Sequence, residues 1–254
     1  MDFSTFAQWS KFGVLLVRPG ALVMTTPLFG TPFAPAPVRI GLAVLFALVA
    51  APVTAVPDLT SAATLTAIIA RESAIGFALG LSVRIIVAAA EGAGQLAGHQ
   101  VGLSYGAMID PQSGVRNSTL AVLYGSLGLV LCFLLGVHHD LLRTWLASYA
   151  ALPIGVGGMG TTMGAVVGQS LAAIFVGALR LAAPVIAVLM IVEVMMGLMS
   201  RAAPSLNLLT VGAPLRLPIG LAVVAASIAA LPSLITRMWP HAAQLAAAAA
   251  EAFR

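Results

Sequence analysis

The chain has 254 residues, of which 60% are hydrophobic and only 8% are charged, and its mean hydropathy is +1.05. Soluble domains carry about 25% charged residues, so this chain has too few charges to cover a surface that faces water. Its 12 Lys and Arg residues are scattered singly and form no basic patch of the kind that binds nucleic acid. The composition excludes an ordinary soluble domain. It favours an integral membrane protein, or one buried in a large hydrophobic assembly, without a nucleic-acid partner.

Six apolar segments can be drawn along the chain, and none of them alternates with the period-two pattern of a β-strand. They span residues 12–30, 38–57, 64–90, 119–137, 165–199 and 217–236. Several approach or exceed the roughly 20 residues that a helix needs to cross hydrocarbon. The predicted fold class is therefore an all-α membrane protein.

Proline and glycine mark expected breaks in these helices. Arg18-Pro19 lies inside the first segment and predicts a kink or break there. The run PIGVGGMGTTMG, residues 153–164, has too many glycines for one continuous helix. The residues after Pro240 predict a short Ala-rich helix at the C-terminus. The N-terminal residues lack the pattern of a cleaved signal peptide, so we expect them to belong to the mature protein.

Motifs that carry catalytic or metal chemistry are weak. The run GVGGMG, residues 155–160, matches a dinucleotide-binding glycine pattern, but no strand precedes it and no acidic residue occurs until Glu193. His138-His139-Asp140 has no nearby third His or Cys ligand, and adjacent side chains on a helix point about 100° apart. The single cysteine, Cys132, supports neither a disulfide within the chain nor a thiolate cluster. We expect no enzyme activity, no cofactor and no metal.

Residues 84–106 carry two parallel patterns at helical spacing. Small residues recur every four positions and would form a smooth stripe against which another helix can pack closely. These residues are Ala90, Gly94, Gly98 and Gly102, with Gly106 continuing the series. Beside them runs a polar face made by Arg84, Glu91, Gln95 and His99. Polar groups are expensive in hydrocarbon, so this face predicts either a ladder of hydrogen bonds between helices or the lining of a pore.

The polar stretch YGAMIDPQSGVRNS, residues 105–118, follows this helix directly. Asp110-Pro111 would end a helix, and Ser113-Gly114 permits a tight reversal. No nucleophile, base or metal set accompanies the stretch, so a catalytic loop is a poor explanation.

Four stretches, taken in order, resemble the FliR family of bacterial flagellar and type III secretion export-apparatus proteins. The central one is AAAEGAGQLAGHQVGLSYGAMIDPQSG, residues 88–114. The others are PLFGTPFAPAPVRIGLA (27–43), LGVHHDLLRTWLASYAALPIG (135–155) and LMSRAAPSLNLLTVGAPLRLPIGL (198–221). Two positions depart from the family pattern: Ala213 replaces a frequent aromatic residue, and Glu193 replaces an expected Asn or apolar residue.

The resemblance implies a non-enzymatic export-gate subunit, one domain over residues 1–254, in the inner membrane at the flagellar basal body. Bent helical hairpins would assemble with FliP-type and FliQ-type subunits into the entry portal for unfolded export substrates. An FlhB-type protein and an FlhA-type ring would be further partners.

The resemblance also implies that the loop at about 106–119 plugs the closed channel. Its predicted residues are Gly106, Met108, Ile109, Asp110, Pro111, Gln112, Ser113, Gly114, Arg116 and Asn117. Met108 and Ile109 would be the apolar stopper, since methionine adapts to irregular surroundings. Asp110-Pro111 would form the bend, and glycines would act as hinges.

Two alternatives stay open at this point. The chain could be a self-contained transporter of small solutes that uses Arg84, Glu91 and Glu193 as coupling charges, although no internal repeat is visible. It could also be the equivalent subunit of a virulence injectisome.

Overall fold

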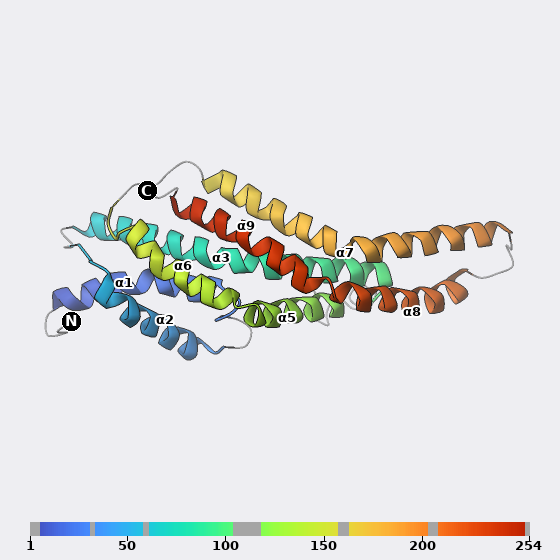
Figure 1. The fold of residues 1–254 in the computed structure, drawn as a ribbon, viewed down its shortest axis with the longest axis horizontal. Coiled ribbons are helices and arrows are strands. Elements are labelled where there is room, and N and C mark those ends of the chain that lie inside the picture. The colour runs from blue at the N-terminus through green and yellow to red at the C-terminus, as the bar shows by residue number, and fades with distance from the viewer. Residues whose placement is uncertain are drawn as a thin grey trace. The chain divides into compact units, whose positions relative to one another are not determined.

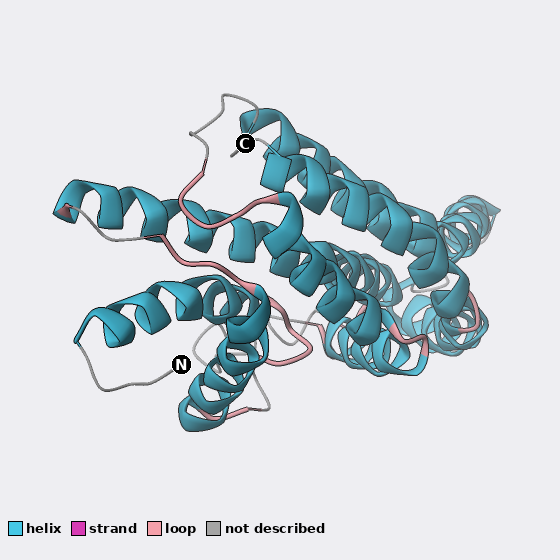
Figure 2. Cartoon of the chain, turned by 60° about the vertical axis from the view of Figure 1, so that its left-hand side comes forward, coloured by secondary structure: helices cyan, strands magenta, loops and turns pink. Residues whose placement is uncertain are grey.

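The computed structural model describes residues 6–30, 34–57, 61–103, 118–156, 163–202 and 208–251. Within these ranges the chain forms only helices and loops (Figure 2). The helices are α1 (Phe6–Thr25), α2 (Ala36–Ala50), the short 3-10 helix η1 (Ala51–Val53), α3 (Ala62–Val101), α5 (Thr119–Leu134), α6 (Val137–Ala151), α7 (Met163–Ala202), α8 (Leu208–Ile228) and α9 (Leu231–Glu251) (Figure 1). The predicted all-α membrane class is confirmed.

Three helical segments in the described ranges are long and apolar enough to cross a membrane: Ala36–Val53, Ala62–Val101 and Gly168–Ala202. Two bent pairs, α5 with α6 and α8 with α9, raise the number to 5 if each pair counts as one broken span. The six segments drawn from the sequence differ because α3 and α7 each extend to 40 residues. In addition, the segments 119–137 and 217–236 are interrupted by short breaks.

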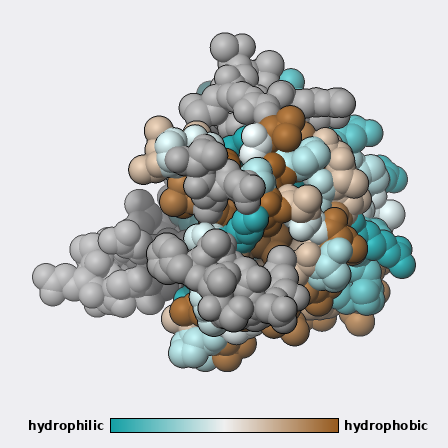
Figure 3. Space-filling view, turned by 90° about the vertical axis from the view of Figure 1, so that its left-hand side faces the viewer, coloured by the Kyte–Doolittle hydropathy of each residue, from teal (hydrophilic) through white to brown (hydrophobic). Residues whose placement is uncertain are grey.

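The surface carries many large apolar side chains, as expected for a protein that water does not surround. In Figure 3 hydrophobic residues lie between hydrophilic ones across the visible face. α7 is the clearest case, since Phe175 is 67% exposed, Leu198 is 63% exposed and Val194 is 62% exposed. These faces need a lipid or protein neighbour, because apolar patches of this size are rare on soluble monomers.

The described chain divides into two compact units, each assembled from segments far apart in the sequence. Unit 1 contains Met1–Ile85, Cys132–Leu171 and Trp239–Arg254. Unit 2 contains Ile86–Leu131 and Ala172–Met238. The expectation that residues 1–254 act as one domain stays a prediction.

Unit 1 is organised around a fully buried arginine. Arg18 of α1 has no exposed surface, and neither has its partner Glu72 of α3. Arg18 Nε donates a hydrogen bond to Glu72 Oε2 at 2.7 Å. Its two other nitrogens reach α6 and the residue after it, donating to Ser148 Oγ and to the carbonyl of Leu152, each at 2.9 Å. The guanidinium also lies over the ring of Tyr149, 4.2 Å from the ring centroid. One side chain therefore joins three helices.

Aromatic rings extend this centre towards α2. Tyr149 packs edge-on against Trp145 with ring centroids 5.7 Å apart, and Trp145 contacts Phe46 of α2 at 5.4 Å. Phe46 in turn meets Phe29, which lies in the turn between α1 and α2, at 5.7 Å. Such pairs add about 0.5–1.5 kcal/mol each beyond the burial of their area. The hairpin of α1 and α2 is thus held against α6 by aromatic contacts as well as by Arg18.

Neither proline breaks its helix, and the Ala-rich residues after Pro240 are helical as expected but continue a helix that begins earlier. α1 continues through Pro19, and α9 begins at Leu231 and continues through Pro240 to Glu251. A helical proline loses one hydrogen bond and crowds the preceding turn, at a cost of about 3 kcal/mol. In α1, the contacts of Arg18, the residue before Pro19, oppose this cost. Arg18 is anchored as described, and Gly76 of α3 sits so close to the Arg18 carbonyl that a Cβ there would overlap it.

Unit 2 has an apolar core of small α3 residues and larger residues from α5, α7, α8 and α9. The α3 face contributes Ala90, Ala93, Ala97 and Val101. The other helices contribute Leu120, Tyr124, Leu181, Ala182, Val185, Leu189, Val224 and Leu231. The hydroxyl of the buried Tyr124 hydrogen-bonds to that of Ser227, which joins α5 to α8. Small residues on one side and large ones on the other let the helices interdigitate.

We expect Glu72→Ala to lower the free energy of unfolding by about 3–5 kcal/mol, because it leaves the Arg18 charge buried without a partner. The double variant Arg18→Met/Glu72→Met should recover most of this loss, since it removes both charges. The measurement is denaturant-induced unfolding of the purified protein in micelles. The control is Asp140→Ala, which removes a surface pair with Arg143 (3.6 Å, side chains 82% and 50% exposed) and should have little effect. If Glu72→Ala is no less stable than this control, the buried ion pair does not stabilise the fold as described.

Candidate functional site

The residues predicted to form a plug, Gly106 to Asn117, lie outside the described residues. What the structure describes is how the chain enters and leaves this segment. Leu103 is the last described residue before it and Ser118 the first after it. The helix ends at both flanks belong to unit 2, so their geometry can be built from that unit alone.

α3 ends at Val101 in a Schellman motif. Gly102 adopts φ +96°, a left-handed conformation that favours glycine. The Gly102 N–H donates to the His99 carbonyl at 3.2 Å, and the Leu103 N–H donates to the Gly98 carbonyl at 3.0 Å. This pair of bonds satisfies carbonyls that the helix leaves without partners. The chain therefore leaves α3 in a defined direction.

The polar face of α3 fixes the other flank. Gln95 Oε1 accepts a hydrogen bond from the backbone N–H of Ser118 at 3.0 Å. Its amide nitrogen lies 3.0 Å from His99 Nε2, which is exposed. Of the other two predicted residues, Arg84 is exposed in unit 1 and Glu91 is half-buried in unit 2. Gln95 thus joins the last turns of α3 to Ser118, the residue that precedes α5.

Arg216 of α8 holds the end of α3 from a second side. Its Nε donates to the carbonyl of Gln100 at 2.5 Å, and its NH2 pairs with Glu193 of α7 at 2.6 Å. Next to it, a Cβ on Gly220 would meet Val101 at 2.7 Å, so α8 approaches α3 closely there. Glu193, the unexpected acid in α7, has a specific partner. We call Gln95, Ser118, Arg216, Glu193 and the Gln100 carbonyl the α3-end frame.

The small-residue stripe meets α5 at Gly94 and Ala90. A Cβ on Gly94 would overlap the Leu120 carbonyl and lie 2.7 Å from the Ala121 Cα. One turn earlier, the Ala90 methyl lies 3.2 Å from where a Gly128 Cβ would be. Gly98 is buried, and Gly102 lies just beyond the helix in the Schellman motif. The role of these residues in a channel stays a prediction.

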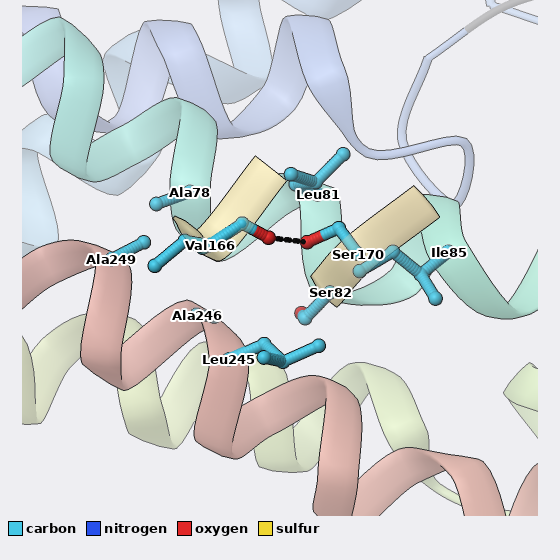
Figure 4. A pocket seen from close by; sticks show the side chains of 9 residues that line it. All are labelled: Ala78, Leu81, Ser82, Ile85, Val166, Ser170, Leu245, Ala246 and Ala249. Atoms are coloured by element: carbon cyan, nitrogen blue, oxygen red, sulfur yellow. Dashed lines mark hydrogen bonds between the residues drawn. The ribbon is translucent and has the colours of Figure 1, made fainter. Parts of the chain in front are cut away.

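One small cavity in unit 1 lies where α3, α7 and α9 converge (Figure 4). Its volume of about 10 Å³ is at the lower limit for a single water. Its two hydroxyls are already bonded within their helices, Ser170 to the Val166 carbonyl at 2.8 Å and Ser82 to the Leu79 carbonyl at 2.6 Å. We interpret this cavity as a seam between helices and assign it no ligand.

In the parts of the chain that the structure describes, no three His, Cys, Asp or Glu side chains converge as metal ligands. The rings of His138 and His139 stack with centroids 3.9 Å apart, and Asp140 pairs with Arg143. α6 begins after Gly136 at φ +75°, so Asp140 lies in its first turn and is not the N-cap.

Sequence reasoning missed the two buried or half-buried ion pairs. Arg18 was noted only for its proline neighbour, and Glu72 was not noted at all. The available signal was that Arg18 is a lone charge in its apolar segment and Glu72 is the one acid in the segment 64–90, and charges in such segments are expected to be paired. In the sequence Arg216 stood out only as part of the family-like stretch 198–221. Its partner Glu193 was assigned to ion coupling in the transporter hypothesis.

The fold and this site define a helical membrane protein with an internal ion pair in each of its two units. Residues 9–242 match the model of the family described as "Bacterial export proteins, family 1". The chain belongs to this family.

Several curated relatives carry the name "Flagellar biosynthetic protein FliR". The protein of Escherichia coli strain K12 is 31% identical over 229 residues, which cover 87% of each chain. That of Caulobacter vibrioides is 28% identical over 237 residues, covering 92% of this chain and 94% of its own. That of Bacillus subtilis strain 168 is 29% identical over 212 residues, covering 82% of each.

We expect Gly94→Ala to destabilise the protein by about 1–3 kcal/mol, because its methyl group would force the backbones of α3 and α5 apart. The matched control is Gly197→Ala in α7, where a Cβ meets nothing within 4 Å. That substitution should be neutral or stabilising by up to about 1 kcal/mol, since alanine is the better helix former. Thermal unfolding of both purified variants measures the difference. Equal melting temperatures would rule out a tight contact at Gly94.

Proposed function

We propose that the chain is a non-enzymatic structural subunit of the flagellar protein export apparatus in the bacterial inner membrane. The observation that carries this proposal is the family match over residues 9–242, together with relatives of similar length named for flagellar biosynthesis. Their name indicates assembly of the flagellum and no enzymatic reaction. The proposed partners are FliP-type, FliQ-type and FlhB-type subunits, an FlhA-type ring and unfolded export substrates.

The exposed apolar faces support a subunit that is covered by neighbours. α7 is long and apolar enough to span a membrane, yet only 33% of its most apolar stretch is buried within this chain. In α2 the share is 17%. These helices therefore present most of their apolar surface outward, and hydrocarbon or other subunits must cover it.

Within this function, we assign the segment 106–117 the role of a plug. The support is the chemistry of its residues and the hydrogen bonds at its two flanks. The Schellman motif and the α3-end frame hold the helix end before the segment and the residue that follows it. A plug opens only if the open state gains comparable interactions, and flanks held in this way would confine the change to the loop.

No observation favours the two alternatives. Glu193, assigned by the transporter hypothesis to ion coupling, is paired with Arg216 at 2.6 Å. The curated relatives bear flagellar names, so a flagellar system is the better assignment than an injectisome.

Deleting the gene should abolish filament assembly and export of filament protein, and the wild-type gene should restore both. A deletion strain with normal export would overturn the proposal. Immunoblots of culture supernatants, with cell lysates as the reference, measure export.

Replacing residues 106–117 by a short Gly-Ser linker should leave the protein in the membrane with its co-purifying subunits but make cells permeable to ions. Loss of the apolar side chains of Met108 and Ile109, the proposed stopper, is the physical reason. Membrane-potential dyes and growth at raised salt measure the leak. Unchanged permeability in an assembled complex would remove the plug assignment and leave the subunit assignment standing.

Gln95→Leu and Arg216→Gln should each produce a smaller leak. The first removes a hydrogen bond worth about 0.5–1.5 kcal/mol, and the second removes charge-assisted bonds worth about 1.5–3 kcal/mol. The larger effect is expected for Arg216→Gln. The control is Arg143→Gln, a substitution of an exposed arginine in α6. Leaks that do not exceed the control would show that the α3-end frame does not act on the segment.

A further inference from the structure

An open apolar groove runs along the hairpin of α1 and α2 in unit 1, with a volume of about 340 Å³. The two helices lie side by side in Figure 1 and Figure 2. The lining residues of α1 fall at helical intervals, so they form one continuous face. The lining consists of Gly13, Leu16, Val17, Gly20, Ala21, Met24, Ile40, Ala43 and Ser73.

Glycine makes the floor of the groove. A Cβ built on Gly13 or on Gly20 meets nothing within 4 Å. The groove is therefore shaped by missing side chains on α1 and does not come from helices that diverge. A larger side chain at either position would fill it without displacing the backbone.

A cation stands at one end of the groove. Arg39 of α2 directs NH1 towards the sulfur of Met24, which lines the groove, at 3.7 Å. A thioether is a weak acceptor. Arg39 Nε is buried and has no hydrogen-bond acceptor among the described residues, and no described carboxylate forms an ion pair with this side chain. The end of the groove thus offers a guanidinium that lacks an anion.

The position of Arg39 fits the surface of a membrane. It is in the first turn of the candidate span Ala36–Val53, so it lies where hydrocarbon begins. From there the groove follows α1 from Met24 back to Gly13. A ligand that satisfies both features is anionic at one end and apolar along its length.

The lining from Gly13 to Met24 extends over about 16 Å along α1, at 1.5 Å per residue. An acyl chain can lie along this length while its headgroup stays at Arg39. A partner helix would cover the apolar lining, but it would supply an anion to Arg39 only if it carried an acidic residue at that point. The charge of Arg39 therefore favours an anionic lipid as the occupant.

We propose that this groove binds one anionic phospholipid of the surrounding bilayer, with its phosphate on Arg39 and an acyl chain along Gly20 and Gly13. Basic pockets beside membrane helices attract anionic headgroups in this way. Bound lipid would cover part of α1 and α2 that the protein leaves open. The proposal depends on the membrane location of α2 and not on the export function.

The test is native mass spectrometry of the full-length protein purified in detergent and titrated with phosphatidylglycerol or with phosphatidylcholine. The wild type should retain phosphatidylglycerol preferentially. Arg39→Gln should weaken its binding about five-fold, the effect of one basic residue near an anionic headgroup. Arg39→Lys keeps the charge and should keep the preference for phosphatidylglycerol.

Gly20→Leu should weaken phosphatidylglycerol binding at least about ten-fold, because a bulky side chain excludes several methylene groups from the groove. The matched control is Gly41→Leu on α2, where a Cβ also meets nothing within 4 Å and the residue does not line the groove. It should bind as the wild type does.

Three results would overturn the proposal. They are equal binding of the two lipids by the wild type, unchanged binding in Arg39→Gln, and Gly20→Leu behaving as Gly41→Leu does. A photo-reactive residue at position 24 that captures protein instead of lipid in the assembled complex would also overturn it, because a partner helix would then occupy the groove. None of these four results depends on whether the deletion strain loses export, so the lipid proposal and the proposed function can fail separately.

Discussion

The hydrogen-bonded ion pair between Arg18 and Glu72 is the constraint on which unit 1 depends. Neither side chain touches solvent, so each charge is tolerable only with its partner in place. Three nitrogens of Arg18 donate to α3, to α6 and to the carbonyl of Leu152, and this fixes the positions of three helices with one residue. It also explains why α1 continues through Pro19, since the residue beside the proline is held by contacts stronger than the local preference for a break.

Unit 2 also holds its helices together with an ion pair, which is half-exposed, and with small residues that let the helices pack closely. Arg216 joins Glu193 to the end of α3, and Gln95 joins α3 to the start of α5. Gly94 allows the α5 backbone to approach α3 closely, beside the bond between Gln95 and Ser118. In a medium without water, polar groups must find partners within the protein. Of the polar face of α3, Gln95 belongs to the α3-end frame in unit 2, which is where the chain enters and leaves residues 104–117.

The outer surface of the protein also has few polar groups to face water. α2 and α7 expose apolar faces that a single chain cannot cover. Family membership indicates an assembly in which other proteins take part, and the groove beside Arg39 indicates a second kind of neighbour, a bilayer lipid. α2 and α7 therefore leave much of their apolar surface outside the core of the chain.

The sequence by itself determined the class, the helical character and the family, because composition, apolar run length and ordered motifs do not depend on which helices touch. It also located the glycine stripe and the polar face, since helical periodicity places Gly94 and Gln95 without any knowledge of α5. Only the tertiary structure decided the partners. Arg18 finds Glu72 across 54 positions, and Glu193 finds Arg216. The local rule that proline ends a helix failed at Pro19, where Arg18 is held by α3 and α6. A long-range contact outweighs a local preference of about 3 kcal/mol, and a single sequence carries no record of which distant residue supplies that contact.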